Sequence, residues 1–600
     1  MSLGGRLHLV LLALALQFQS APPPAASGAL IVGQVIDVAS KRPVAGAVVA
    51  LGGPPAPNGQ PRQPVLTGSD GRFVFRDLRR GNYNLNAVKP GYVDGAYGRT
   101  RAGGPSTPLI IKDDDRRGDL VLRLWRHAAI SGTVVDESGE RQVGVQIRAY
   151  RRTSAGGRRR YVPSGVASTD DRGIYRIGTL TPGHYIVGTA PRHLSIPLSL
   201  ARAGGNESER IGVELAGRGG AVIVGDAGYV LGPGSPTPPP PTAGRFAVYP
   251  AVYHPAAPAG DAASVIAVSA GDDYSGADIQ IRPVPSVTVS GFIMGPDGPV
   301  TVTPLRLIPA GAMEVPADSD GLTAMTDRQG AFVFPAVPSG YYTLKLNRGQ
   351  SAGFPAPNIT QSPLMWVDLP LTVGEESMEN LGVTASAGVR ISGRLEFEGD
   401  PSRPRGQLQN VQVTIEPADV AAGIAARPVI ARANASGEFT SPPLTGGQYF
   451  VRIADSPSGW MFKGASVEGR DIADTPLTLQ SDTSNVSVQF TDRWSGVSGR
   501  VQTAGGPASD AAVIVFPTDI DAWASSGQFP RRLRMTRVAG GGEYSFNLPE
   551  GEYYLIAVRD DQAADWQDLE FLEEASREAT RVRINEGERR VQDVRLRVTR

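Results

Sequence analysis

One short pattern returns five times along this chain, at intervals that each suit one domain. It is a stretch of the form apolar-x-Gly-x-apolar, in which apolar side chains alternate with others. Alternation with a period of two is typical of a β-strand with one buried face. A pattern that recurs at domain-sized intervals indicates one structural unit used repeatedly. The five stretches are Ile31–Val35, Ile130–Val134, Val289–Ile293, Ile391–Leu395 and Val497–Val501.

Each copy continues with a turn that ends Gly-x-aromatic. In the middle copies Asp170, Asp327 and Asn434 stand three residues before the glycine. An Asp or Asn side chain there can close a turn on its own backbone, while glycine supplies a positive φ without steric cost. The first and fifth copies depart from the pattern, with Gly68 and Ala539 at this place. The five turns end at Gly71–Phe73, Gly173–Tyr175, Gly330–Phe332, Gly437–Phe439 and Gly542–Tyr544.

A third element, apolar-x-x-Gly-x-Tyr, follows in every copy and leads into another alternating stretch. A tyrosine at such a corner uses its hydroxyl to tie the preceding loop to the backbone, as in immunoglobulin sandwiches. We therefore expect these tyrosines to be structural. The five elements are Leu78–Tyr83, Leu180–Tyr185, Val337–Tyr342, Leu444–Tyr449 and Leu548–Tyr553.

These patterns predict an all-β chain of tandem immunoglobulin-like, seven-stranded β-sandwich domains, joined by short linkers into a semi-rigid rod. A chain of 600 residues is too long for one core, and its 73 glycines and 50 prolines suit a turn-rich protein. The second copy carries a Gly/Pro-rich insertion at about 191–261, which we expect to be flexible. One helix is expected, over Trp566–Ala579. The expected domains are residues 28–126, 127–285, 286–388, 389–491 and 492–600.

Residues 1–27 have the features of a secretory signal peptide. Arg6 supplies a positive charge, and Leu7–Phe18 forms an apolar run that is short for a membrane span. We expect cleavage between Ser20 and Gly28; an uncleaved anchor is the alternative. No later stretch is apolar enough to predict a transmembrane segment. The expected location is extracytoplasmic, either periplasmic or secreted.

Charge and cysteine content exclude several classes of function. The chain has 59 basic and 59 acidic residues, so no net positive field favours nucleic acid, and we expect no nucleic-acid partner. It has no cysteine, which excludes disulfides, thiolate metal sites and cysteine nucleophiles. The domains must therefore be held by core packing alone.

Taken together, the three patterns resemble the carboxypeptidase regulatory-like domain. Thr169–Tyr175 with Leu180–Tyr185 matches best, and Thr326–Phe332 with Val337–Tyr342 is similar. The resemblance covers nearly all of the chain after the signal and implies a prealbumin-like sandwich, related in fold to starch-binding-like modules. The last two copies look like the paired C-terminal units of large exported bacterial proteins. The family name refers to a module beside peptidase domains, so the resemblance implies a fold and no activity.

Enzymatic alternatives lack the residues they need. The five histidines form no metal-ligand pair, which argues against a zinc peptidase. Gly349–Gly353 has the spacing of a nucleophile elbow around Ser351, but no histidine follows His254. Hydroxyisourate hydrolases share the sandwich, yet their C-terminal signature is missing. We expect no catalytic residue, no cofactor and no metal; calcium at Asp113–Asp115 or Asp318–Asp320 is the alternative.

The expected function is therefore that of an exported, non-catalytic binding or scaffold protein. Carbohydrate is the first candidate ligand, because aromatic rings outside clear strands can stack on sugar rings. The candidate ligand-binding residues are Trp460, Phe462, Trp523 and Trp566. Packing of these rings onto the domain flank is the alternative. Other candidate functions are contact with a cell-surface protein, a structural spacer, or an unrecognised hydrolase.

Overall fold

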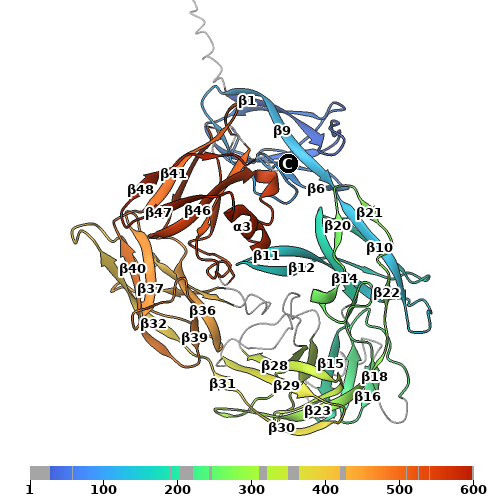
Figure 1. The fold of residues 1–600 in the computed structure, drawn as a ribbon. Helices are drawn as coiled ribbons and strands as arrows, with labels where there is room; N and C mark the ends of the chain where they lie inside the picture. Colours follow the sequence, from blue (N-terminus) through green and yellow to red (C-terminus); the bar gives the residue numbers. More distant parts are fainter. Residues whose placement is uncertain are drawn as a thin grey trace, which may run out of the picture. The chain divides into compact units, whose positions relative to one another are not determined.

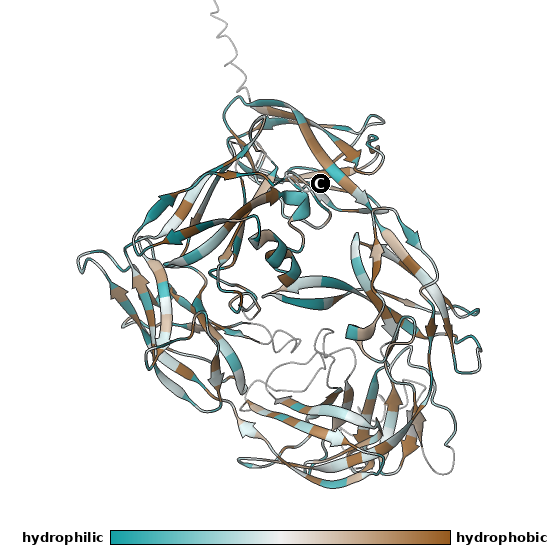
Figure 2. Cartoon of the chain, viewed as in Figure 1, coloured by the Kyte–Doolittle hydropathy of each residue, from teal (hydrophilic) through white to brown (hydrophobic). Residues whose placement is uncertain are grey.

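A computed structural model describes most of residues 28–597 and separates the chain into two compact units. One unit holds residues 1–99 and 105–125, and the other holds residues 100–104 and 126–600. The described residues are 28–56, 59–189, 191–202, 221–241, 246–309, 321–348, 364–418, 428–508, 510–524, 526–538 and 541–597. Nearly all regular structure in them is β, arranged as sandwiches with apolar residues along the strands (Figures 1 and 2). The predicted fold class, tandem immunoglobulin-like sandwiches, is confirmed.

The first unit is one sandwich, drawn in blue in Figure 1. Its strands are β1 (Ala29–Asp37), β2 (Val48–Gly52), β3 (Val65–Leu66), β4 (Arg72–Leu78), β5 (Gly81–Val88), β6 (Tyr92–Val93), β7 (Gly95–Ala96), β8 (Leu109–Ile111) and β9 (Arg116–Arg126). One sheet has the order β4-β1-β9-β6, and the other has β3-β2-β5-β7 with β8 beside β5. Ile31, Phe73 and Leu122 are among the buried side chains that fill the space between them.

The second unit begins with a sandwich of the same plan. Its elements are β10 (Ala128–Val135), β11 (Gln146–Ala155), β12 (Arg158–Ser168), β13 (Ile174–Leu180), β14 (Gly183–Thr189), β19 (Val252–Tyr253), η1 (Gly260–Ala262), β20 (Ile266–Val268), β21 (Asp273–Tyr274) and β22 (Ile279–Gln280). One sheet has the order β13-β10-β21 with β22 beside β10. The other has β12-β11-β14-β19 with β20 beside β14.

The third sandwich is larger because it receives strands from the insertion. Its own strands are β23 (Val284–Gly295), β24 (Gly298–Pro299), β25 (Pro304–Pro309), β26 (Leu322–Met325), β27 (Ala331–Pro338), β28 (Gly340–Arg348), β29 (Met365–Val373), β30 (Met378–Thr384) and β31 (Ser386–Ala387). The insertion supplies β15 (His193–Pro197), α1 (Leu198–Arg202), β16 (Ala221–Val224), β17 (Ala227–Leu231) and β18 (Ala247–Val248). One sheet has eight strands in the order β16-β17-β15-β26-β25-β28-β29-β31.

The fourth sandwich has sheets in the orders β35-β32-β40-β37-β38 and β34-β33-β36-β39. Its elements are β32 (Ile391–Glu398), η4 (Leu408–Asn410), β33 (Gln412–Pro417), β34 (Val429–Arg432), β35 (Glu438–Thr440), β36 (Gly447–Ile453), β37 (Met461–Val467), β38 (Arg470–Asp471), β39 (Leu477–Leu479) and β40 (Thr483–Thr491).

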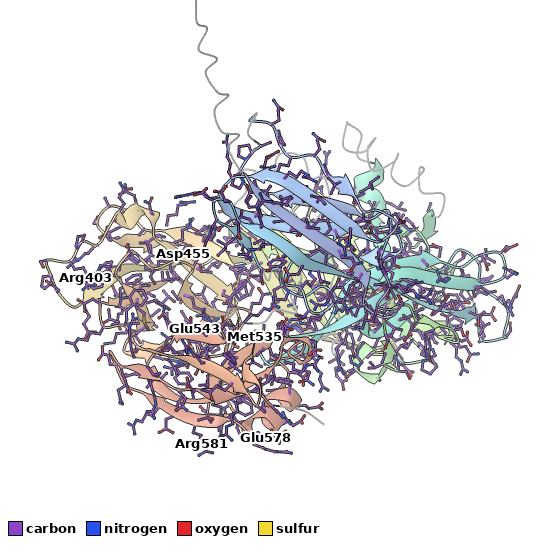
Figure 3. All side chains as sticks on the ribbon, turned by 90° about the horizontal axis from the view of Figure 1, so that it is seen from above. Arg403, Asp455, Met535, Glu543, Glu578 and Arg581 are labelled. Atoms are coloured by element: carbon purple, nitrogen blue, oxygen red, sulfur yellow. The ribbon has the colours of Figure 1, made fainter. Side chains whose placement is uncertain are left out.

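The fifth sandwich buries β43 on both faces. Its elements are β41 (Gly496–Thr503), β42 (Gly506–Pro507), β43 (Ala511–Pro517), β44 (Arg534–Arg537), β45 (Glu543–Asn547), β46 (Gly551–Arg559), η6 (Asp560–Gln562), α3 (Leu569–Ser576), β47 (Thr580–Ile584), β48 (Arg589–Val591) and β49 (Val594–Arg595). Leu572 of α3 helps to cover the outer face of β43, and Met535 packs against the same cluster (Figure 3). The helix starts later than the sequence predicts, at Leu569, because the Asp568 side chain caps it by accepting a hydrogen bond from the Glu570 amide.

A shared register links the first two sequence patterns. The opening strand of every sandwich pairs antiparallel with the strand that carries the turn aromatic. It pairs parallel with a strand near the end of the same copy, called here the closing strand. The closing strands are β9, β22, β30, β40 and β49. The glycine of the opening strand always lies opposite that aromatic residue. The five pairs are Gly33 with Phe73, Gly132 with Tyr175, Gly291 with Phe332, Gly393 with Phe439 and Gly499 with Tyr544.

The glycine is required because the closing strand passes very close to it. A Cβ atom at Gly291 would overlap the carbonyl oxygen of Leu381, and one at Gly393 would overlap that of Val486. The parallel pairing is irregular at this point in both copies. Since backbone atoms cannot move aside cheaply, only glycine fits.

The predicted tyrosine corner is confirmed in all five copies. Each tyrosine hydroxyl donates a hydrogen bond to the carbonyl oxygen four residues earlier in the chain. The pairs are Tyr83 with Arg79, Tyr185 with Thr181, Tyr342 with Pro338, Tyr449 with Thr445 and Tyr553 with Pro549. The donor distances for Tyr83 and Tyr342 are 2.9 and 2.8 Å. Each bond closes the corner on itself and leaves the ring in the core.

The predicted side-chain turns also form. Asp327 Oδ1 accepts hydrogen bonds from the amides of Gln329 and Ala331, both at 2.8 Å. Gly330 in the same turn has φ of 79°, so it occupies the left-handed region that glycine tolerates best.

The domain boundaries, and the predicted rod, remain predictions.

The insertion of the second copy was predicted to be flexible, and for its described parts this is wrong. β15 pairs parallel with β26 through Leu194 and Ser195, and β18 pairs antiparallel with β23. The hairpin β16–β17 extends the same sheet beyond β15. These strands pair with edge strands of the third sandwich. Their backbone N–H and C=O groups therefore form hydrogen bonds that a loop would not make.

The fourth and fifth sandwiches share a buried ion pair. Glu416 and Arg452 are 1% and 5% exposed, and Arg452 Nη1 donates to Glu416 Oε2 at 2.7 Å. Arg452 also donates to the carbonyl oxygens of Ser526 and Phe529 in the fifth sandwich, at 2.8 and 3.1 Å. Glu416 in turn accepts from the amides of Gln528 and Phe529. Charged groups of one domain therefore satisfy backbone groups of the next.

Further charged contacts surround this pair. Asp474 of the fourth sandwich accepts from Arg531 at 2.7 Å and from Arg532 at 2.6 Å. The junction thus contains further ion pairs besides Glu416–Arg452.

Replacement of Gly291 by Ala should destabilise the third sandwich by about 1–3 kcal/mol, because the new Cβ forces β30 away from β23. Thermal and denaturant unfolding of the chain measure this change. The matched control is Gly382→Ala on β30, where the nearest atom to a new Cβ is a ring carbon of Phe292 at 3.6 Å. A variant as stable as the control would show that the strands do not approach as described.

Replacement of Arg452 by Met should cost about 3–5 kcal/mol, because Glu416 is left buried without its cation. The double variant Glu416→Met with Arg452→Met should recover much of this loss, since no charge is then buried. Unfolding of the chain monitors both. Arg500→Met serves as control: its pair with Glu543 is exposed, so the expected change is under about 1 kcal/mol. Equal effects at Arg452 and Arg500 would contradict the buried junction.

Candidate functional site

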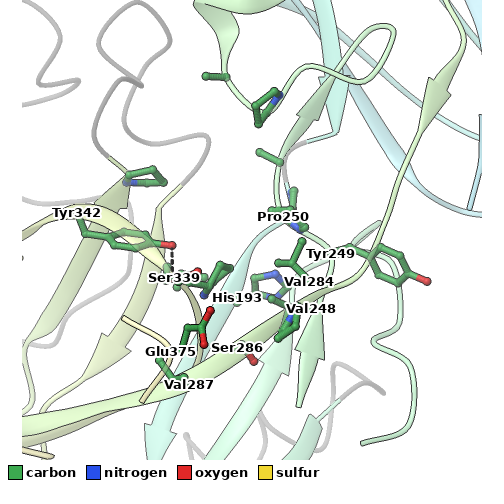
Figure 4. Close-up of a pocket in the computed structure, with 18 of the residues that line it drawn as sticks. His193, Val248, Tyr249, Pro250, Val284, Ser286, Val287, Ser339, Tyr342 and Glu375 are labelled. Atoms are coloured by element: carbon green, nitrogen blue, oxygen red, sulfur yellow. Dashed lines mark hydrogen bonds between the residues drawn. The ribbon is translucent and has the colours of Figure 1, made fainter. Parts of the chain in front are cut away.

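A cavity of about 600 Å³ lies where the insertion strands join the third sandwich (Figure 4). It is lined by the start of β15, the β18–β19 connection, the first residues of β23 and the turn between β27 and β28. Its volume falls in the range of small-molecule sites in proteins. Because β15 and β18 come from the insertion, the second copy's extra residues build this cavity.

His193, the first residue of β15, is the most unusual side chain in the cavity wall. It is 7% exposed, and its ring is stacked on that of Tyr229, with centroids 5.1 Å apart and planes 18° from parallel. Burial lowers the pKa of His193 to about 4, so the imidazole is uncharged at neutral pH. Tyr229 is supplied by β17, the neighbouring strand in the sheet.

Three buried polar atoms in this part of the sheet have no hydrogen-bond partner. They are Nδ1 of His193, Oγ of Ser195 and the hydroxyl of Tyr229. Ser195 lies two residues from His193 on β15 and directly opposite Tyr229 on β17, so the three side chains share one face. Leaving a buried polar atom without a partner costs about 1–3 kcal/mol, so three such atoms on one face of the sheet mark a locally costly arrangement.

Two hydroxyls of the cavity wall are already engaged by the backbone. Ser286 Oγ donates to the carbonyl oxygen of Phe246 at 2.7 Å, and the Tyr342 hydroxyl donates to that of Pro338 at 2.8 Å. Glu375, in the turn between β29 and β30, is exposed and carries the one negative charge among the described residues of the wall. Figure 4 labels Glu375, Ser339 and His193 among the residues that line the cavity.

The remaining wall is apolar and stiff. It contains Val248, Val284, Val287 and Leu322 together with six prolines. Proline has no side-chain rotamers to lose, so such a wall keeps its shape when a ligand enters. The prolines are Pro191, Pro250, Pro258, Pro285, Pro309 and Pro338.

No motif in the sequence indicates this site as a whole. The sequence does contain a hairpin pattern next to His193. Gly225–Asp226 separates the apolar runs Ala221–Val224 and Ala227–Leu231. The structure forms that hairpin, with Gly225 at φ 58°. The position of His193 against another domain had no signal in the chain, because it depends on how β15 pairs with β26.

Two of the predicted aromatic ligand residues lie in cores. Trp460 is 1% exposed, packs edge-on against Phe397 with centroids 4.9 Å apart, and donates its indole N–H to the Pro404 carbonyl oxygen at 3.0 Å. Trp523 is also 1% exposed and donates to the Pro517 carbonyl oxygen at 2.7 Å. The expectation of exposed rings is wrong for both, since each indole has its polar atom satisfied inside the domain.

The other two predicted rings are half-buried. Phe462 on β37 contacts the ring of Phe490 and lies under the guanidinium of Arg531, 5.5 Å from its ring centre. Trp566 packs against the cluster beneath α3. The four residues are not brought together in one site among the described residues, and sugar binding by any of them stays a prediction.

Several further expectations can be compared with the structure. Asp113–Asp115 form the turn before β9, and Asp115 pairs with Arg117 at 3.1 Å. Within the described ranges, no three His, Asp or Glu side chains gather closely enough to hold a metal ion. Three predicted segments lie outside the described residues: Asp318–Asp320, Gly349–Gly353 and the predicted signal at 1–27. No helix in the described part of the chain is long and apolar enough to cross a membrane.

The stability of the protein should fall as the solution is acidified through the range in which His193 titrates. The unfolded chain binds a proton at this residue near pH 6.5, whereas the folded chain does so only near pH 4. The contribution is therefore fully present above pH 6.5 and is lost as pH falls towards 4, by about 3 kcal/mol. Unfolding curves at several pH values measure it. His193→Phe keeps the stacking and should flatten this part of the profile; an unchanged profile would contradict the buried imidazole.

Comparisons with known proteins agree with the fold. The family model of the carboxypeptidase regulatory-like domain matches residues 31–111, which form the first sandwich. The predicted resemblance is thus confirmed there, and the later sandwiches repeat its pairing scheme. No curated protein matches the chain.

Solved structures with a similar fold are distant. A streptococcal ancillary pilin is 12% identical and covers 61% of this chain and 99% of its own, with a TM-score of 0.20. The major pilin subunit of Bacillus cereus is 10% identical, covers 60% and 99%, and has a TM-score of 0.15. Two B repeat units of the collagen-binding protein of Staphylococcus aureus are 11% identical, cover 77% and 99%, and have a TM-score of 0.11. At these TM-scores none of them supports an argument about function.

Proposed function

We propose that this chain is an exported, non-catalytic binding protein in which tandem sandwiches act as a scaffold for one small-molecule cavity. The observation that carries the proposal is His193. It is a buried, uncharged imidazole with an unpartnered nitrogen, in the wall of a cavity of about 600 Å³. Nδ1 itself is sealed inside the protein, so a ligand in the cavity would be selected through a hydrogen bond to the other ring nitrogen, Nε2.

The surroundings of His193 support binding over catalysis. A histidine that works as a general base is usually oriented by a second group, often a carboxylate, and lies within reach of a nucleophile. Here the ring is held by stacking on Tyr229, and its Nδ1 is unpartnered. The hydroxyls of Ser286 and Tyr342 are committed to backbone carbonyls. The arrangement suits recognition of a ligand's polar group.

Contact with a partner protein is a second candidate function, favoured by exposed apolar residues in the fifth sandwich. Ile520 and Phe529 are each 63% exposed and lie on the connection between β43 and β44. Exposed apolar side chains that are close in the chain are typical of interaction surfaces. Carbohydrate remains a proposal for the half-buried Phe462 and Trp566, whose rings are partly accessible.

A library screen on the mature protein tests the proposal. Small molecules and oligosaccharides are screened by ligand-observed NMR against wild type, His193→Phe and the control His184→Phe, since His184 on β14 is outside the cavity wall. We expect at least one compound whose affinity falls about tenfold with His193→Phe and is unchanged in the control. Absence of any such compound would overturn the cavity as the site, and turnover of a compound would overturn the non-catalytic role.

A further inference from the structure

We propose that the cavity binds a small aromatic compound that is uncharged or cationic and carries a hydrogen-bond donor, as phenols and aryl amines do. This inference rests on the proposed function and specifies the chemistry of the ligand. Three properties of the wall lead to it: its shape, its charge and the uncharged imidazole of His193.

The shape of the wall favours a flat ring. Six prolines and four aliphatic side chains line about 600 Å³, a space that suits a compound of one or two rings. A rigid ring buries a large apolar area and has little conformational freedom to lose, so a rigid apolar wall binds it well. Sugars fit this wall poorly, because each ring hydroxyl needs a polar partner and most of the wall is proline and aliphatic side chain.

The charge of the wall excludes anions as the preferred ligand. No Lys or Arg is among its described residues, and Glu375 supplies a negative charge. A carboxylate or phosphate entering the cavity would lose its water without gaining a cation. An ammonium group near Glu375 would instead be complemented, and an uncharged compound would pay no such cost.

The uncharged imidazole of His193 favours a ligand that carries a hydrogen-bond donor. Nδ1 is sealed inside the protein, so the ring offers a ligand its other nitrogen, Nε2. A neutral imidazole has one nitrogen that donates and one that accepts. Stacking on Tyr229 fixes the plane of the His193 ring, so the direction of the accepted hydrogen bond is set before the ligand arrives. A hydroxyl or amine on an aromatic ring can donate to Nε2 while the ring lies against the prolines.

The inference is tested with three probes of similar shape on the mature full-length protein. They are tyramine, which is cationic, para-ethylphenol, which is neutral, and para-hydroxyphenylpropionate, which is anionic. Titration calorimetry and ligand-observed NMR measure their affinities. We expect the first two to bind and the anion to bind at least tenfold more weakly, since it lacks a cation in the wall.

Variants separate the contributions of the wall. His193→Phe should weaken tyramine and para-ethylphenol about tenfold, as expected for loss of one hydrogen bond. Glu375→Gln should weaken tyramine about threefold and leave para-ethylphenol unchanged, because only the cation interacts with that charge. His184→Phe is the control and should change neither. Ser339→Trp, an exposed position in the wall, should block both probes even if His193→Phe fails to fold.

The outcomes distinguish this inference from the proposed function. If the aromatic probes do not bind but another class of compound binds in a His193-dependent way, the ligand class is wrong and the proposed function stands. If probes bind equally well to wild type, His193→Phe and Ser339→Trp, the location is wrong. If no compound of any class binds, both proposals fall. Preference for the anionic probe would overturn the argument from charge.

Discussion

The close approach of the closing strand to the opening-strand glycine is the constraint on which every sandwich depends. At that residue the opening strand pairs on one side with the aromatic strand and on the other with the closing strand. In two copies the opposing aromatic is a tyrosine that reaches the closing strand: Tyr175 donates to the Ala277 carbonyl oxygen at 2.5 Å, and Tyr544 donates to that of Gln592. Because the opening-strand glycine has no side chain, all three strands can pack together at this point. The register of the whole sheet follows, because a slip of one residue would turn apolar side chains to the solvent.

Local hydrogen bonds then close each sandwich without covalent help. The chain has no cysteine, so no disulfide limits the unfolded state. The tyrosine corners and the side-chain turns have their partners within four residues, so they form wherever the local sequence is right. This explains why both were predictable from spacing alone. The fifth copy has Ala539 in place of the turn Asp, and its Gly542 still has a positive φ of 77°.

Contacts between sandwiches rely on strand pairing and buried charges, and not on local turns. The insertion strands join the third sandwich by backbone pairing, whereas the fourth and fifth sandwiches meet through Glu416 and Arg452. A buried ion pair contributes little net stability over an apolar pair, but it penalises any arrangement that leaves one charge alone. Such a junction therefore specifies one geometry. The cavity near His193 is a product of the other kind of junction, where the insertion strands meet the third sandwich's sheet and leave space between proline-rich loops.

Sequence by itself determined the elements whose partners lie nearby in the chain or recur in every copy. These are the five opening strands, the turns, the tyrosine corners and the family of the first domain. It did not determine where the aromatic rings point: Trp460 follows a glycine in a loop, and only packing against Phe397 places it in a core. Nor did it determine that β15 crosses to the third sandwich, because any exposed sheet edge can accept a strand. The cavity and the burial of His193 were decided only by the tertiary structure. Burial, unlike strand periodicity, depends on residues brought together from distant parts of the chain.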